Sequence, residues 1–308
     1  MQLRVPASSA NLGPGFDSLG LALGIYLTCR FQRAARLEIR VRGRDAAQIS
    51  TGEDNLIWRT ALAVAADVGA GSISSAGGPN SSDALPPISL EIDNDIPLGK
   101  GLGSSASALT AGVVIADHLL RLNWKRHRIL DEAAKLEGHP DNVAACVLGS
   151  IVASATDIGG AVRAVRVELP LSYGVAVVVP DFVLPTSESR HVLPANYSKN
   201  DTVFNVQRSA LLIAALATGT TSAFPAALED RMHQPYRYAL VPGLEEIVKL
   251  RAPGLLGCAL SGAGPSIVVF YERGSEQVCD LVRQIFALHG HNSETLCAPI
   301  ALGGYELS

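Results

Sequence analysis

This chain has no surplus of basic charge and no long apolar run, and each absence excludes a class of function. Its 25 lysine and arginine residues are outnumbered by 29 aspartate and glutamate residues, for a net charge of −4 at pH 7. Such a balance offers no basic surface to nucleic acid or to an anionic membrane. The longest apolar run, residues 210–217, is too short to cross a bilayer, and the segment Met1–Pro6 lacks the apolar core of a signal peptide. We therefore expect a soluble protein without a nucleic-acid or membrane partner.

Cysteine is scarce, and the five cysteines are scattered with no C-x-x-C pair. This spacing indicates neither a zinc site nor a disulfide framework. Buried free thiols in a reducing compartment are the simpler interpretation, so we expect a cytoplasmic protein. The chain does have apolar residues in quantity, since 48% of its 308 residues are hydrophobic and only 18% are charged. That is enough for a full core and about two domains.

The segment that follows residue 88 predicts an anion site. Residues 88–92 alternate apolar and polar side chains, as in a strand with one buried face, and the turn formers at 93–95 end that strand. Three glycines at alternate positions follow, so backbone N–H groups can approach an anion closely. Ser104 and Ser105 are typical N-cap residues, and a helical apolar spacing comes after them. Free N–H groups and the positive end of a helix dipole, brought to one point, make a phosphate site.

The loop matches neither of the two commoner nucleotide loops, G-x-x-x-x-G-K-[ST] and G-x-G-x-x-G. A flexible turn before a core helix would account for the glycines alone. The complete string P-x-G-x-G-L-G-S-S-A is more specific, and it resembles the ATP-binding motif of the GHMP small-molecule kinases. In related kinases an Asn at the start of the preceding helix lies near the nucleotide, which implies the same position for Asn55. The residues that the resemblance assigns to ATP in the loop are Pro97, Leu98, Gly99, Lys100, Gly101, Leu102, Gly103, Ser104, Ser105, Ala106 and Ser107.

The N-terminal string P-A-S-S-A-N-L-G-P-G-F-D, residues 6–17, contains two glycines and two prolines that make a rigid turn. This turn displays Asn11 and Asp17 after the first strand. An Asx turn and a helix cap are the ordinary interpretation of these two residues. The string closely resembles the substrate motif of the homoserine kinases within the GHMP family. That resemblance implies that Asn11 and Asp17 contact an amino acid substrate.

A second string, E-G-H-P-D-N-V-A, ends a helix expected over residues 125–136. It places Glu137 at the helix end and His139 and Asp141 in a tight turn. By spacing alone, these three residues could be ligands of a transition metal or parts of a capped helix junction with a solvated histidine. The string resembles the second signature of the homoserine kinases, which implies that the acidic residue Glu137 holds Mg²⁺ and that His139 lies at the substrate.

Magnesium prefers oxygen ligands in octahedral geometry, so one carboxylate and one hydroxyl, with phosphate oxygens and waters, would complete its shell. Glu137 and Ser104 fit these roles, and we expect both to be metal-binding and catalytic residues. Some relatives carry an additional Asp, proposed as a base, in the region where this chain has Asn142. Because an amide cannot abstract a proton, we expect no dedicated general base and assign Asn142 to substrate binding.

Two strings in the second half of the chain add to the substrate site. Residues 185–190 alone would be an exposed polar loop, but their P-T-x-x-x-R pattern resembles that of the homoserine kinases. The resemblance implies that Arg190 binds the substrate and that Thr186 takes part in catalysis. Arg237, in Q-P-Y-R, matches a second substrate arginine on a shorter motif. The string S-G-A-G-P-S at 261–266 is either a plain hairpin loop or, by resemblance, the third family motif, which packs against the phosphate loop.

Other segments predict the architecture. Residues 37–41 read as an antiparallel strand with one solvent face, and the Gly- and Ser-rich segment 71–87 as a surface insertion. The apolar run 173–179 predicts a buried central strand. The resemblance implies an α+β fold. It also implies two domains: residues 1–166, an N-terminal ATP-binding domain like the second domain of ribosomal protein S5, and residues 167–308, a ferredoxin-like C-terminal domain.

The resemblance implies an enzyme that uses ATP and Mg²⁺ to phosphorylate the hydroxyl of L-homoserine, a step of threonine biosynthesis. Two alternatives stay open. One is a kinase of the same fold acting on another small alcohol such as mevalonate, and the other is a catalytically silent ligand-binding relative. Ser104 and Glu137 argue against a silent relative, which needs no metal pair. The sequence leaves a homodimer open and says nothing of feedback by threonine.

Overall fold

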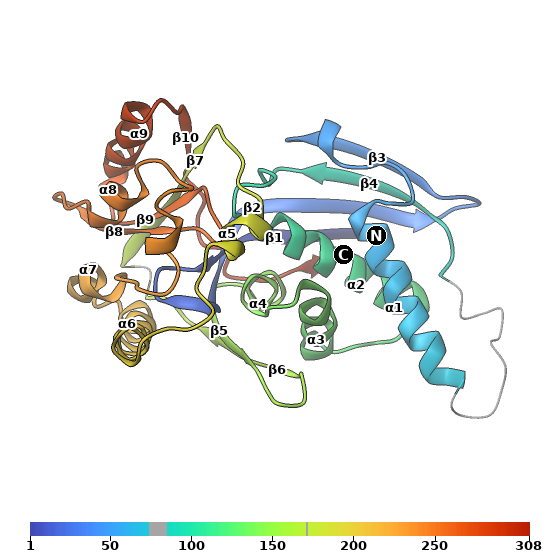
Figure 1. Ribbon diagram of the computed structural model, residues 1–308. Helices are drawn as coiled ribbons and strands as arrows, with labels where there is room; N and C mark the ends of the chain where they lie inside the picture. Colours follow the sequence, from blue (N-terminus) through green and yellow to red (C-terminus); the bar gives the residue numbers. More distant parts are fainter. Residues whose placement is uncertain (74–84, 171) are drawn as a thin grey trace.

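A computed structural model describes residues 1–73, 85–170 and 172–308, which form two β-sheets with helices packed on them. Figure 1 shows the N-terminal half of the chain, blue to green, on one side and the C-terminal half, yellow to red, on the other. This arrangement confirms the predicted α+β class. Among the described residues, no helix is both long and apolar enough to span a membrane.

The first sheet has seven strands and is organised by the long strand β2. β2 runs antiparallel to β1, while its first half also pairs with β5 and its second half with β4. β3 pairs with β4 in parallel, so the expected antiparallel strand at 37–41 is wrong in its direction. Alternating side chains show that one face is buried but fit either direction of pairing. The strands of this sheet are β1 (Gln2–Asn11), β2 (Gly15–Arg33), β3 (Glu38–Gly43), β4 (Ile88–Asn94), β5 (Ile151–Thr156), β6 (Val162–Val167) and β11 (Glu306–Leu307).

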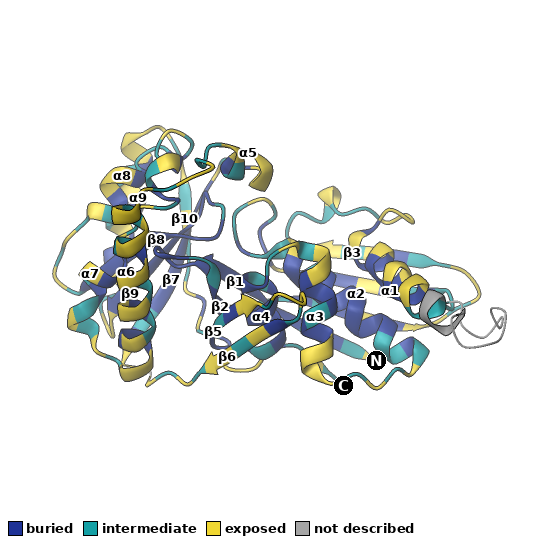
Figure 2. Cartoon of the chain, turned by 60° about the horizontal axis from the view of Figure 1, so that its bottom comes forward, coloured by how far each residue is buried: buried dark blue, intermediate teal, exposed yellow. Residues whose placement is uncertain are grey.

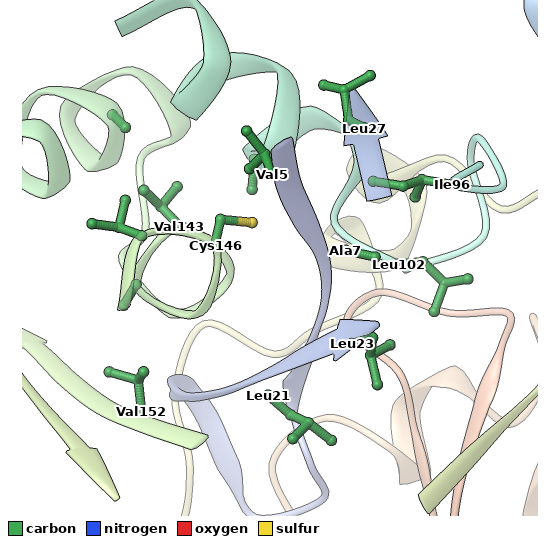
Figure 3. Close-up of a cluster of buried hydrophobic side chains, with 14 of the residues drawn as sticks. Val5, Ala7, Leu21, Leu23, Leu27, Ile96, Leu102, Val143, Cys146 and Val152 are labelled. Atoms are coloured by element: carbon green, nitrogen blue, oxygen red, sulfur yellow. The ribbon is translucent and has the colours of Figure 1, made fainter. Parts of the chain in front are cut away.

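Helices α2 and α4 pack directly on β1 and β2, and α1 and α3 pack on α2. Figure 3 shows the apolar layer between them, where Val5 of β1 lies near Val143 and Cys146 of α4. Most of α2 is buried because it lies between α1 and the sheet. The sequence analysis did not predict α4. The four helices are α1 (Leu56–Ile73), α2 (Ser104–Leu120), α3 (Arg126–Glu137) and α4 (Asp141–Leu148), with a short 3-10 turn, η1 (Ala46–Gln48), before α1.

The second sheet has four strands in the order β10-β7-β9-β8, each pair antiparallel. With α6 between β7 and β8, and α9 between β9 and β10, this is the predicted ferredoxin-like arrangement. The expected central strand is confirmed, since β7 is almost entirely buried between β9 and β10. The elements are β7 (Tyr173–Pro180), β8 (Leu255–Leu260), β9 (Ile267–Glu272), β10 (Ser293–Leu296), α5 (Thr186–His191), α6 (Lys199–Thr218), α7 (Phe224–Ala227), α8 (Leu244–Lys249) and α9 (Cys279–Leu288), with 3-10 turns η2 (Thr221–Ala223), η3 (Pro235–Arg237) and η4 (Glu276–Val278).

The chain crosses between the sheets twice. β6 pairs with β5 and ends at Val167, next to the boundary proposed after residue 166. After β10 the chain returns, because Ile300 bridges Leu23 and β11 pairs with β1. The last residues therefore belong to the first sheet, although the division into residues 1–166 and 167–308 would place them in the second domain. Figure 2 shows the buried strands at the centre of both halves and the exposed outer faces of α6 and α8.

The segment 71–87, expected as a surface insertion, divides into three parts. Its first residues continue α1 to Ile73, so the expected start of the insertion is wrong. Residues 74–84 lie outside the described part of the chain. Residues 85–87 then lead into β4, which begins at Ile88.

Candidate active site

The glycine-rich loop that joins β4 to α2 depends on its glycines. Gly101 and Gly103 have φ angles of 73° and 67°, in the left-handed region that favours glycine. A Cβ atom on Gly101 would lie 2.2 Å from the carbonyl oxygen of Ser261, and one on Gly103 would lie 1.9 Å from Oγ of Ser8. The loop is therefore held between the first strand and the 261–266 segment, with no space for a side chain at either position.

The N-terminus of α2 offers unused donors. Gly103 occupies the N-cap position without a side-chain cap, so the expected capping by Ser104 or Ser105 is wrong. Within the described residues, no hydrogen bond uses the N–H groups of residues 101–106. The 17-residue helix directs its positive dipole end toward these groups. This geometry supports the predicted phosphate site.

The resemblance assigns Lys100 to ATP with the rest of the loop, but its side chain is bound elsewhere. Its Nζ donates hydrogen bonds of 2.9 and 2.6 Å to the carbonyl oxygens of Pro180 and Phe182, at the end of β7. Burial lowers the pKa of the Lys100 ammonium, although the carboxylates nearby act in the opposite direction. The side chain thus connects the loop to the second sheet, and only its backbone remains a candidate phosphate ligand.

The 261–266 segment packs against the phosphate loop, as the resemblance implied. Ser261 Oγ lies 2.7 Å from the carbonyl oxygen of Gly101, and the N–H of Ser266 donates to the carbonyl of Lys100 at 3.2 Å. The N–H of Gly262 donates to Ala10 in β1 at 3.0 Å. These bonds join the two sheets on either side of the loop.

A cavity of about 140 Å³ opens between the two sheets, and it brings together most of the predicted residues. A larger depression of about 890 Å³ lies near the end of α2 and contains none of them. We therefore place the candidate active site in the smaller cavity, where the chemistry is concentrated. The predicted residues that line it are Asn11, Asp17, Gly99, Gly101, Leu102, Gly103, Ser104, Ser105, Glu137, His139, Asn142, Thr186, Arg190 and Arg237, and Asp141, Leu184, Pro185, Gly262 and Ala263 line it as well.

Asp17 and Arg190 form a two-bond ion pair at this cavity. Arg190 Nη2 lies 2.8 Å from Asp17 Oδ1, and Nη1 lies 3.2 Å from Oδ2. The sequence analysis had placed both residues at the substrate without foreseeing that they would pair. Asn11 Oδ1 accepts a hydrogen bond from the Asp17 N–H, and Asn11 Nδ2 donates to the carbonyl of Gly262. Asn11 and Asp17 both have positive φ angles, 69° and 52°, so the turn is a strained one held by its surroundings.

Glu137 ends α3 beside the phosphate loop, as expected. Its Oε2 accepts a hydrogen bond of 2.9 Å from Ser105 Oγ, rather than from the neighbouring Ser104 that was predicted as its metal-binding partner. Burial raises the pKa of Glu137, although His139 and the Ser105 hydroxyl act in the opposite direction. A cation close to this carboxylate would stabilise its charged form.

His139 is oriented by Asp141. Their Nδ1 and Oδ1 atoms lie 2.8 Å apart, and since a carboxylate accepts, Nδ1 carries the proton. Burial disfavours the charged ring, yet the hydrogen bond and the charge of Asp141 prevail and raise the pKa of His139. Asp141 is the first residue of α4 and is buried, so the expected tight turn ends one residue earlier. The sequence analysis named Asp141 only as a possible metal ligand or part of a helix junction, although the H-x-D spacing that carries this contact was visible in the string.

Asn142 faces the same cavity, and its amide oxygen accepts a hydrogen bond of 2.8 Å from Ser8 Oγ. Its N–H and its Nδ2 group both donate to Asp141 Oδ1.

Within the described residues, the side chains of Asp17, His139 and Asp141 form the one group of three His, Cys, Asp or Glu ligand atoms close enough to share a metal ion. One member of this group, Asp17, is already paired with Arg190.

Arg237 is buried, with 1% of its surface exposed, although it borders the cavity. Its Nε donates to the carbonyl of Ser189, and its Nη1 lies close to His233 Nδ1 and the carbonyl of Gly262. Burial lowers the pKa of Arg237 to about 10, and Arg190 acts in the same direction. Sequence reasoning did not find these partners, because they lie on three separate segments.

Asn55 does not line the cavity of the other residues. Its Oδ1 accepts from the N–H groups of Ile57 and Trp58 and its Nδ2 donates to the carbonyl of Ser50, so it caps α1. It borders a second cavity of about 420 Å³, which Ser104 and Ser105 also line from the other side of the loop. The predicted proximity to a nucleotide stays a prediction, with this second cavity as its location.

Comparisons with known proteins show the family of the chain. The family models described as "GHMP kinases N terminal domain" and "GHMP kinases C terminal" match residues 55–150 and 212–286. The chain is 68% identical to the homoserine kinase of Solibacter usitatus, over 99% of this chain and 96% of the relative. It is 41% identical to the homoserine kinase of Deinococcus radiodurans, over 98% of this chain and 95% of that one.

Two solved structures share the fold. A homoserine kinase from Cytophaga hutchinsonii superposes with a TM-score of 0.82 at 24% identity, covering 99% of this chain and 96% of that chain. A Lactococcus lactis galactokinase complexed with galactose superposes with a TM-score of 0.66 at 17% identity, covering 99% of this chain and 94% of that one. At these identities the likeness concerns the fold alone.

Proposed function

This chain belongs to the homoserine kinases of the GHMP kinase family, and we propose that it transfers the γ-phosphoryl group of ATP to the hydroxyl of L-homoserine. The product is O-phospho-L-homoserine, and the reaction is a step of threonine biosynthesis. One observation carries the proposal: a single cavity places the Asp17–Arg190 ion pair beside the unused N–H groups of the phosphate loop. The alternative of a different alcohol such as mevalonate is not favoured, since a relative at 68% identity is a homoserine kinase.

The ion pair suits an amino acid. Homoserine carries an ammonium and a carboxylate, so its site needs one anionic group and one guanidinium. Asp17 and Arg190, already paired with each other, can exchange that contact for the two ends of the zwitterion. Arg190 has a planar fork that holds a carboxylate through two parallel hydrogen bonds. We assign the ammonium to Asp17 and Asn11, and the carboxylate to Arg190 and Arg237.

The donors beside the loop fit Mg²⁺. Glu137 supplies a carboxylate, and the adjacent Ser104 and Ser105 supply hydroxyls, which are the hard oxygen ligands that this cation prefers. We propose Glu137 and Ser104 as its protein ligands, with Ser105 released from its bond to Glu137 on binding. When bound, Mg²⁺ neutralises charge on the phosphate oxygens.

The chain's own residues then contribute by holding the reactants. Loop N–H groups 101–106 bind phosphate oxygens, and the 261–266 segment keeps the loop in place. Such positioning supplies most of the catalysis in phosphoryl transfer, whose transition state is loose. No carboxylate is assigned as a base: Asp17 is paired with Arg190, and Asp141 Oδ1 already accepts from His139 and Asn142. His139 borders the cavity and completes the pocket around the hydroxyl, and Thr186, at the start of helix α5, lines the same cavity.

The test is to incubate the purified protein with labelled ATP, Mg²⁺ and a panel of alcohols that includes homoserine, mevalonate and 3-amino-1-propanol. We expect rapid phosphorylation of homoserine only. Equal or faster use of mevalonate would replace the substrate assignment, and binding of homoserine without any transfer would favour a silent relative. A cytoplasmic location and a homodimer also remain proposals, to be checked by fractionation and by light scattering.

A further inference from the structure

A buried polar network lies next to the candidate active site, in the segment 230–237 that ends with η3. It contains Asp230, His233 and Arg237, and His233 has no exposed surface. Histidine and arginine are seldom buried so completely unless specific partners hold them. The proposed mechanism uses only the arginine, so the histidine needs an explanation of its own.

Asp230 builds the turn. Its oxygens accept hydrogen bonds from the backbone N–H groups of Met232, His233 and Gln234 and from Asn205 Nδ2 of α6. Burial would raise the pKa of Asp230, but the nearby His233 and these donors prevail and lower it. An ionised carboxylate at the centre of the turn fixes the backbone from which His233 and Arg237 extend.

The proton on His233 can be located from its partners. Nε2 lies 2.7 Å from the carbonyl oxygen of Gly13, which can only accept, so Nε2 carries the proton. Burial lowers the pKa of His233, although Asp230, whose Oδ2 lies 3.5 Å from Nε2, acts in the opposite direction. The ring is therefore neutral, and Nδ1 is an acceptor. Arg237 Nη1 lies 2.9 Å from Nδ1 and donates to it.

This contact decides which part of Arg237 is available. Nε donates to the carbonyl of Ser189, and Nη1 donates to His233 and to the carbonyl of Gly262. Among the described residues, no hydrogen bond uses Nη2 of Arg237. The guanidinium is thus held along one side, and Nη2 keeps two unused donors at the edge of the cavity that Arg237 lines.

His233 also contacts the turn that carries the cavity residues Asn11 and Asp17. Its bond to Gly13 holds this turn. The ring of Phe16 in that turn stacks on His233, with centroids 5.4 Å apart. The guanidinium groups of Arg190 and Arg237 lie 5.6 and 5.8 Å from the centre of the Phe16 ring, within cation–π distance.

We infer that His233 is a positioning residue of the amino acid subsite. Its neutral ring accepts a hydrogen bond from Arg237 and donates one to Gly13. It thereby fixes the position of the carboxylate-binding guanidinium relative to the Asn11–Asp17 turn. This inference rests on the proposed function, because it takes Arg237 to bind the carboxylate of the substrate. His233 does not line the cavity and acts only through Arg237 and the turn. Its loss should therefore weaken the binding of homoserine and leave the binding of ATP unchanged.

Two variants separate the two bonds. His233→Gln keeps a donor near the Nε2 position for Gly13 and removes the acceptor at Nδ1. We expect it to raise the KM for homoserine about tenfold, the scale of one hydrogen bond to a charged group, with the KM for ATP unchanged. His233→Asn keeps an acceptor near Nδ1 and should recover most of that loss. For 3-amino-1-propanol, which has no carboxylate, the wild type and His233→Gln should perform alike. His127→Gln, on the exposed face of α3, is the matched control.

The outcomes distinguish the inference from the proposed function. If the wild type does not phosphorylate homoserine, the proposed function fails. If it does, and His233→Gln leaves the KM for homoserine within twofold or weakens ATP and both alcohols equally, the positioning role is overturned. Should either variant not fold, the inference can still be tested on the wild type by NMR. Nitrogen NMR of the His233 ring should show the proton on Nε2 at neutral pH, and a proton on Nδ1 would overturn the inference.

Discussion

Replacing Arg190 by Lys should weaken the binding of homoserine while leaving ATP binding almost unchanged. Arg190 uses both terminal nitrogens toward Asp17, at 2.8 and 3.2 Å, which shows that its fork is oriented to meet a carboxylate with two donors. Lys keeps the charge but has a single nitrogen, so at least one charge-assisted hydrogen bond to the substrate carboxylate is lost.

The size of the effect follows from the exposure of the site. A hydrogen bond to a charged group contributes about 1.5–3 kcal/mol, and about 1.4 kcal/mol corresponds to a tenfold change in affinity. Because 38% of the Arg190 side chain is exposed, water competes for the lost bond and the lower end applies. We therefore expect the KM for homoserine to rise about tenfold, and by no more than about a hundredfold.

The assay is the initial rate of ADP release at saturating ATP, with homoserine and 3-amino-1-propanol as substrates. The amino alcohol lacks the carboxylate, so it should be a poor substrate for the wild type and lose little more in Arg190→Lys. The matched control is Arg208→Lys. Arg208 lies on α6 and pairs with Glu229 at the surface. The assignment fails if the amino alcohol is used as well as homoserine, or if Arg190→Lys weakens ATP more than homoserine.

Three further predictions test the neighbouring residues. Glu137→Gln keeps the shape of the side chain and removes its charge, so turnover should fall about a hundredfold or more at saturating substrates; a rate within a few fold of wild type would exclude a role in metal binding. Asn55→Ala removes the α1 cap and should lower the free energy of unfolding by about 1 kcal/mol in urea titrations, whereas a large rise in the KM for ATP at unchanged stability would point to a nucleotide contact instead. The raised pKa of His139 means that the ring contributes stability that is complete below its ordinary pKa of 6.5 and is lost as the pH rises through the folded-state pKa. The difference in unfolding free energy between wild type and His139→Gln should therefore shrink as the pH rises above the ordinary histidine pKa of 6.5, and a difference that grows with pH would show that Asp141 does not raise the pKa.

Sequence reasoning identified residues of the candidate cavity most readily where they lie in one continuous string. The local geometry of such a string is set by residues that are close in sequence. Examples are the glycines of the loop, Glu137 at a helix end and Arg190 after a P-T pair. Such segments are recognisable because glycine and proline constrain the backbone in known ways. The buried strand 173–179 was found for a similar reason, since a continuous apolar run is typical of a central strand.

Contacts between residues far apart in the sequence could not be predicted from the sequence alone. The direction of β3 depends on its partner β4, 50 residues later, and the alternation of side chains is the same for either direction. Arg237 was identified by motif, but its position is set by Ser189, His233 and Gly262. The bond from His233 to Gly13 spans 220 residues. Asn55 was assigned to the nucleotide because a motif gives a location, whereas its capping bonds appear only once α1 is built.

The pairing of β11 with β1 has a consequence for how the protein is made. β1 leaves the ribosome well before its edge partner, because the strand Glu306–Leu307 is synthesised only after the four strands of the second sheet. Until then the edge of β1 at Leu3 and Arg4 has no partner strand, and an unpaired edge is where other chains can add a strand. The first sheet is thus completed late in synthesis, and removing residues 306–308 would leave the edge of β1 at Leu3 and Arg4 without its partner strand.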